Sequence, residues 1–247
     1  MIPVSGICLF RSSFPLSKLQ TIDYADGDTP LKGLYALLEG QPRAAITVYP
    51  TFMNSTPGVE AKALELVDAG YAVMIADFFG PGVPSTVDEA FEALGTLTSD
   101  PVAMRERFRA SLEATKGLAP DVPQLAIGFC LGGKAVLEMA REGQDLVAVA
   151  SFHGLLETAT PATDAIKARI LVCHGDADPM VPRAHVMGFW EEMDAAKADW
   201  HFHSYSGVDH GFTQSIGFDG QPNPAYNASA DRQSWRSMMD LFDEALG

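Results

Sequence analysis

The chain has 247 residues, of which 47% are hydrophobic and 20% charged, a composition that excludes intrinsic disorder and can supply a sizeable core. Seventeen basic against 32 acidic residues give a net charge of −15, which disfavours nucleic-acid backbones and anionic membrane surfaces as partners. The three cysteines, Cys8, Cys130 and Cys173, are too few for a disulfide framework and indicate a reducing compartment.

The first residues lack a basic opening, and Arg11 interrupts a short apolar run. We therefore expect neither a signal peptide nor a membrane span, and a cytoplasmic location. The length fits a single domain over residues 1–247, with residues 1–18 as a candidate N-terminal extension.

Strand and helix patterns alternate along the chain. The predicted strands are Leu31–Leu38, Ala44–Tyr49, Tyr71–Phe78, Gln124–Phe129, Leu146–Phe152, Arg169–His174 and Trp200–Tyr205. The predicted helices are Pro57–Ala69, one that begins at Ser99–Asp100–Pro101, Leu131–Arg141, Arg183–Ala196 and Ala230–Leu246. Apolar strands alternating with helices predict an α/β fold with a mostly parallel sheet covered on both faces. Residues 85–116 are the one candidate for partial cover, and no large cap domain is expected.

The strongest functional motif is Gly128–Gly133 (GFCLGG), which lies between a predicted strand and a predicted helix. This is the context of a nucleophile elbow, here with Cys130 where serine is commoner. Small neighbours let the strand and helix approach each other. The helix N-terminus favours a thiolate, and the N–H of Leu131 can donate to an oxyanion.

Two later loops offer an acid and a base. His174–Pro182 contains Asp176 and Asp178, either of which can orient a histidine, and the residues alone do not choose between them. His210 follows the last predicted strand and precedes a glycine, which suits a general base. The order nucleophile, acid, base is that of the α/β-hydrolases.

Other residues receive weaker assignments. Phe79, Phe129 and His153 are candidate pocket residues because they stand at strand ends. We expect no metal site, since His201 and His203 share one strand face without a third ligand at suitable spacing.

Together, GFCLGG at 128–133, GDADPMVP at 175–182 and DHGF at 209–212 resemble the dienelactone hydrolase family of α/β-hydrolases. The resemblance covers most of the chain from about Leu31 onward. It implies ester or lactone hydrolysis with Asp178 as the acid, an oxyanion hole from the N–H groups of Leu131 and Phe52, and no cofactor. A small-molecule ester or lactone is thus the expected partner, and the sequence does not indicate the oligomeric state.

The chain departs from the family pattern at three places. Thr51 stands where the family has a glutamate that helps to ionise the cysteine, and we count it as a candidate substrate-binding residue. Pro81 and Gln214 stand where the family has arginines that hold a substrate carboxylate, which favours a neutral substrate. These departures keep open a non-catalytic binding or sensor protein and a thioesterase. A thiol-redox role lacks a resolving cysteine in the elbow.

Overall fold

The computed structural model describes residues 18–247, and Cys8 and most of the candidate N-terminal extension lie outside this range. In the described part of the chain, eight strands form one sheet in the order β1-β2-β4-β3-β5-β6-β7-β8. The strands are β1 (Gln20–Asp26), β2 (Thr29–Ala36), β3 (Ala45–Tyr49), β4 (Ala72–Ile75), β5 (Gln124–Phe129), β6 (Ala148–Phe152), β7 (Arg169–Gly175) and β8 (Trp200–Tyr205). β2 is antiparallel to β1 and β4, and the six strands β3 to β8 run parallel to one another.

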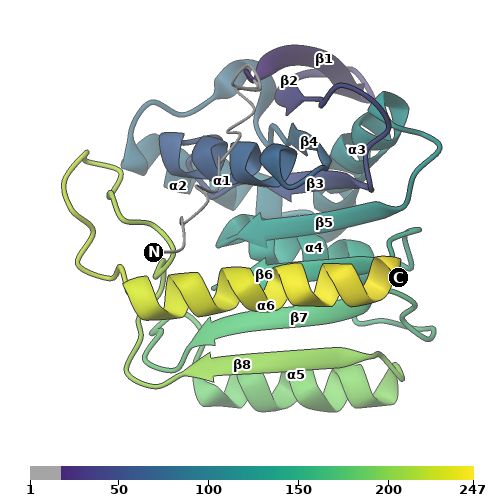
Figure 1. Cartoon of the computed structure of the whole chain (residues 1–247). Coiled ribbons are helices and arrows are strands. Elements are labelled where there is room, and N and C mark those ends of the chain that lie inside the picture. Colours follow the sequence, from purple (N-terminus) through teal and green to yellow (C-terminus); the bar gives the residue numbers. More distant parts are fainter. Residues whose placement is uncertain (1–17) are drawn as a thin grey trace, which may run out of the picture.

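Helices cover both faces of this sheet (Figure 1). They are α1 (Pro57–Asp68), α2 (Val87–Thr98), α3 (Pro101–Leu118), α4 (Leu131–Arg141), α5 (Arg183–Ala195) and α6 (Ala228–Leu246), with a short 3₁₀ turn at Gly80–Gly82. α1 and α6 pack on one face, and α3, α4 and α5 pack on the other, each face with its own buried apolar cluster. The predicted α/β fold, with a mostly parallel sheet and no large cap among the described residues, is confirmed.

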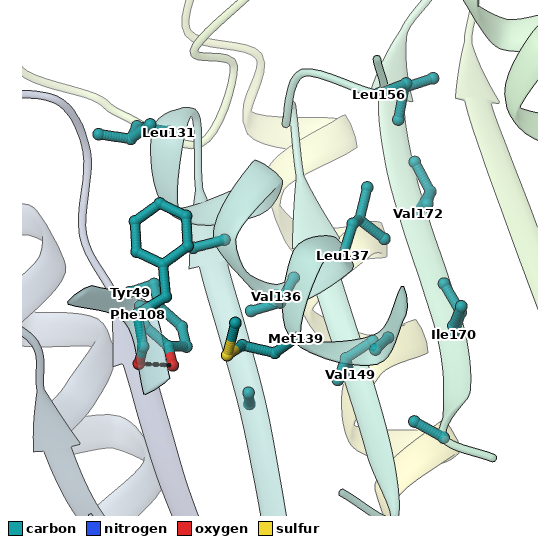
Figure 2. Packing of buried hydrophobic residues seen from close by; sticks show 14 of the residues in the cluster. Tyr49, Phe108, Leu131, Val136, Leu137, Met139, Val149, Leu156, Ile170 and Val172 are labelled. Carbon is teal, nitrogen blue, oxygen red and sulfur yellow. Dashed lines mark hydrogen bonds between the residues drawn. The ribbon is translucent and has the colours of Figure 1, made fainter. Parts of the chain in front are cut away.

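The core beneath α4 fixes the orientation of that helix. Figure 2 shows Val136, Leu137 and Met139 of α4 packed against apolar residues of β6 and β7. Tyr49 at the end of β3 is fully buried, and its hydroxyl donates to the backbone carbonyl of Phe108 in α3 at 2.6 Å. A helix held in this way can present its N-terminus at one defined place beyond the sheet.

The clearest differences from the sequence-based prediction concern three elements. β1 was not predicted, because its mostly exposed, polar sequence QTIDYAD carries little apolar signal and pairs only with β2. α2 was assigned only as part of the covering segment, although Thr86 caps it by accepting from the backbone N–H of Glu89 at 3.2 Å. The strand expected at Tyr71–Phe78 is shorter than predicted, because the carboxylate of Asp77 binds the N–H groups of the turn that follows.

No helix among residues 18–247 has the length and apolarity needed to cross a membrane.

Candidate functional site

Cys130 occupies a sharp turn between β5 and α4. Its backbone angles are φ 55° and ψ −113°. Residues other than glycine rarely adopt this backbone conformation, and those that do are found most often at functional sites. Its N–H donates to the carbonyl of Phe152 at 3.0 Å, and its side chain is partly exposed. The strained turn therefore holds the sulfur at the N-terminus of α4.

The glycines of the motif are required by close backbone contacts. A Cβ on Gly128 would lie 1.9 Å from the carbonyl oxygen of Gly132, and a Cβ on Gly132 would lie 2.0 Å from that of Tyr49. Gly133 packs against the backbone of Gly154 in the same way. The expected need for small residues on both sides of Cys130 thus has a direct steric cause.

The segment after β3 lies against the elbow. The N–H of Gly132 donates to the carbonyl of Pro50 at 3.0 Å, which joins the first turn of α4 to the segment that carries Phe52. The oxyanion hole expected from the N–H groups of Leu131 and Phe52 stays a prediction, and in the described part of the chain neither group is occupied by a protein acceptor.

His210 and Asp178 form a close pair. The Nδ1 of His210 lies 2.7 Å from Oδ2 of Asp178, whose Oδ1 accepts the N–H of Met180 at 2.8 Å. Asp178 is buried, whereas Asp176 forms a 2.6 Å ion pair with the exposed Arg183. The structure thus brings Asp178, and not Asp176, to the histidine.

The second ring nitrogen of His210, Nε2, is buried and makes no conventional hydrogen bond within the described part of the chain. Burial alone would lower the pKa of His210. The hydrogen bond to Asp178 and the nearby Cys130 sulfur outweigh burial and raise that pKa to about 10. The histidine is therefore held between an acid on Nδ1 and a sulfur on the other side, in a setting that favours the protonated ring.

His153 packs behind this pair. Its ring lies edge to face with that of His210 at a centroid distance of 5.1 Å, and its Nε2 is 2.8 Å from the hydroxyl of Thr213. Burial holds the pKa of His153 well below its usual value, and the neighbouring His210 charge lowers it further, so the ring is neutral. Thr213 was not identified from the sequence, since only the folding of its loop brings it to His153.

The remaining predicted site residues have different positions. The side chains of Thr51, Phe129 and His153 are buried, and their expected contact with a substrate stays a prediction. Phe129 stacks on Phe152 within the core. Thr51 accepts the N–H of Met53 at 3.2 Å and orders the turn that carries Phe52.

Phe79 is partly exposed and remains a candidate for direct contact. It lines a cavity of about 470 Å³ between the β4 loop, α2 and α3. Cys173, by contrast, is fully buried in β7, where desolvation raises the pKa of its thiol to about 12. Of the two described cysteines, only Cys130 is thus accessible to a substrate.

A buried network missed by the sequence analysis supports the loop after β4. Asp77 accepts from Asn54 Nδ2 at 2.9 Å and from the N–H of Lys32 at 2.8 Å, while Asn54 adopts a positive φ of 64°. Asparagine tolerates this backbone conformation, but no pattern in the sequence indicated that Asn54 would bind Asp77. The network ties the turn containing Phe52 to the turn containing Phe79.

Comparison with known proteins identifies the family. Residues 32–246 match the dienelactone hydrolase family. The chain is 36% identical over 153 residues to the uncharacterized protein K02A2.1 of Caenorhabditis elegans, covering 58% of this chain and 94% of that protein. It is 24% identical over 209 residues to a probable 2-oxo-3-(5-oxofuran-2-ylidene)propanoate lactonase of Bradyrhizobium sp, covering 79% and 81% of the two chains.

Among solved structures, the chain is similar to a dienelactone hydrolase-like promiscuous phosphotriesterase, P91, from metagenomic libraries. The TM-score is 0.86 at 31% identity, over 94% of this chain and 100% of the other. The fold is that of the α/β-hydrolases, and the protein belongs to the dienelactone hydrolase family.

Proposed function

We propose that this protein hydrolyses carboxylic esters or lactones, with Cys130 as nucleophile, His210 as general acid and base, and Asp178 as the residue that orients His210. The 2.7 Å contact between His210 and Asp178, beside a cysteine on a strained elbow, carries the proposal. Membership of a family of ester and lactone hydrolases supports the same reaction class.

The reaction begins when the thiolate of Cys130, formed by transfer of its proton to Nε2 of His210, attacks the carbonyl carbon. The N–H groups of Leu131 and Phe52 bind the resulting oxyanion. Collapse of the tetrahedral intermediate breaks the acyl C–O bond, and His210 returns its proton to the leaving alkoxide. The product of this half-reaction is a thioester on Cys130 and a neutral His210.

Acylation prepares the second half-reaction. The thioester carries no charge, so the part of the raised His210 pKa that comes from Cys130 is lost, which makes the neutral ring easier to maintain than in the free enzyme. His210 can then take a proton from water while the water oxygen attacks the thioester. Breakage of the C–S bond releases the acid and restores the thiolate and imidazolium.

A neutral substrate fits this site better than a charged one. Pro81 and Gln214 occupy the places where the family has arginines for a substrate carboxylate, and the chain carries a net charge of −15. A thiolate is also a good leaving group, which favours strained lactones and activated esters over amides. One relative is described as a promiscuous phosphotriesterase, so a neutral phosphotriester belongs in the substrate panel.

The test is hydrolysis of 4-nitrophenyl acetate and a small lactone by the intact protein, by Cys130→Ala and by His210→Ala. We expect turnover by the intact protein, loss of nearly all of it in both variants, and an acetyl adduct on Cys130 by mass spectrometry. His201→Ala, which changes an exposed histidine on β8, is the matched control and should retain activity. An intact protein inert on the whole panel would refute the proposal and favour a binding or sensor role.

A further inference from the structure

Three aromatic side chains from distant parts of the sequence meet at the candidate oxyanion hole. Phe91 of α2 and Phe218 of the loop before α6 both contact Phe52, with ring centroids 4.9 Å and 5.2 Å from that of Phe52. The Phe52–Phe218 contact is edge to face and the Phe52–Phe91 contact is tilted, the arrangements that aromatic pairs prefer. We call these three residues the Phe52 cluster.

Two of the three side chains in the Phe52 cluster are exposed to solvent. Phe52 is 9% exposed, but Phe91 is 55% and Phe218 is 40% exposed, so two large rings keep part of their faces in water. Contiguous exposed apolar surface marks a binding site more often than scattered single residues do. Phe91 is held in place through its neighbour Ala90, which is fully buried in the core, where α2 packs against α3.

The position of the cluster connects it to the proposed chemistry. Phe52 supplies one of the two proposed oxyanion donors through its own backbone N–H, and its side chain packs in the same apolar cluster as Leu131, which supplies the other. An ester whose carbonyl oxygen bound these N–H groups would therefore lie beside the exposed rings. The rings can remove an alkyl or aryl group of that ester from water.

The charges near the cluster disfavour an acidic substrate. The cluster itself carries no ionisable group, and α2 has Asp88, Glu89 and Glu92 in its sequence with no basic residue. A carboxylate on the substrate would find no counter-ion on this helix and would be repelled by its acids.

We propose that the Phe52 cluster binds the apolar part of a neutral ester and so determines the substrate specificity of the site. The inference rests on the proposed ester hydrolysis and adds to it a substrate class, esters with an uncharged alkyl or aryl group of several carbons. The apolar group can stand on the acyl or on the alcohol side of the ester bond. Two substrate series separate these cases.

For the acyl side, kcat/KM is measured for 4-nitrophenyl acetate, butanoate and hemisuccinate, which share one leaving group. Each methylene fully buried contributes roughly four-fold, so butanoate can gain up to about 15-fold over acetate through contact with the rings. We expect Phe91→Ala and Phe218→Ala each to lower the butanoate-to-acetate ratio by roughly 3- to 10-fold, because butanoate loses more contact with the rings than acetate does. The hemisuccinate should be the poorest substrate of the three.

For the alcohol side, ethyl and butyl acetate are compared in the same variants, since these alcohols differ little in reactivity. Phe91→Leu, which keeps apolar bulk, should retain most of the selectivity that Phe91→Ala loses. Met187→Ala is the matched control, because Met187 is a large exposed apolar residue on α5, far from α2 (Figure 1).

Four outcomes are informative. A loss of selectivity in one series assigns the cluster to that side of the ester, and unchanged ratios in both series, with the intact protein active, would overturn the inference while leaving the proposed hydrolysis standing. Failure of the proposed function itself shows as an intact protein that is inactive on every ester. A preference for hemisuccinate over butanoate would also overturn the inference.

Discussion

Replacement of Asp178 by asparagine tests how the structure prepares His210. The change keeps the size of the side chain but removes the negative charge that lies 2.7 Å from Nδ1. Asparagine can also donate to Nδ1, which leaves the proton on Nε2 and prevents that nitrogen from accepting the proton of Cys130. Both effects should lower activity without removing a group that touches the substrate.

The magnitude follows from the pKa of His210. That pKa is raised from 6.5 to about 10, a difference that corresponds to roughly 5 kcal/mol in favour of the protonated ring. Asp178 and Cys130 share this effect, so loss of the Asp178 carboxylate removes part of it, about 1–3 kcal/mol, or roughly 10- to 100-fold in rate. With the wrong tautomer added, we expect kcat/KM to fall by about 10²- to 10⁴-fold.

The assay is hydrolysis of 4-nitrophenyl acetate at pH 7.5, together with NMR titration of the imidazole. The pKa of His210 should fall in Asp178→Asn. The matched control is Asp176→Asn in the same loop, whose carboxylate pairs with the exposed Arg183 and whose loss should change activity by less than about three-fold. If Asp176→Asn were the more damaging change, or if Asp178→Asn stayed within about three-fold of the intact protein, the assignment would be refuted.

Three further predictions concern stability, measured by denaturant unfolding. Gly132→Ala should destabilise the fold by about 3 kcal/mol or more, because its Cβ would lie 2.0 Å from a carbonyl oxygen of β3. Gly188→Ala on α5 should instead stabilise the fold by about 0.5–1 kcal/mol, because its Cβ would meet no atom within 4 Å and alanine favours the helix. Glu138→Ala should cost about 3 kcal/mol, because the guanidinium groups of Arg141 and Arg105 both lose this buried carboxylate, while Glu192 still pairs with Arg141 at 2.7 Å. A destabilisation below about 1 kcal/mol would show that the pair is dispensable. Because the pKa of His210 is raised in the folded protein from 6.5 to about 10, its stabilising contribution is complete below pH 6.5 and is lost as the pH rises to about 10. The free energy of unfolding relative to His210→Asn should therefore fall across this window, and a flat difference would contradict the raised pKa.

The sequence by itself determined the local features. The Gly128–Gly133 motif predicted the elbow, because the steric need for glycine at a tight strand-to-helix turn is a property of the backbone alone. The apolar runs predicted the parallel strands for a similar reason, since both faces of a covered sheet must be apolar. β1, which is largely exposed and pairs along one edge only, carried no such pattern and was missed.

Only the tertiary structure decided which of these features meet. Asp176 and Asp178 are equivalent in the residue pattern, and the turn that buries one and leaves the other with Arg183 depends on how β7 packs against its neighbours. The same holds for the contacts of the Phe52 cluster, whose members are separated by as many as 166 positions in the sequence. Contacts between distant segments depend on the packing of the whole fold, which no local pattern of residues encodes.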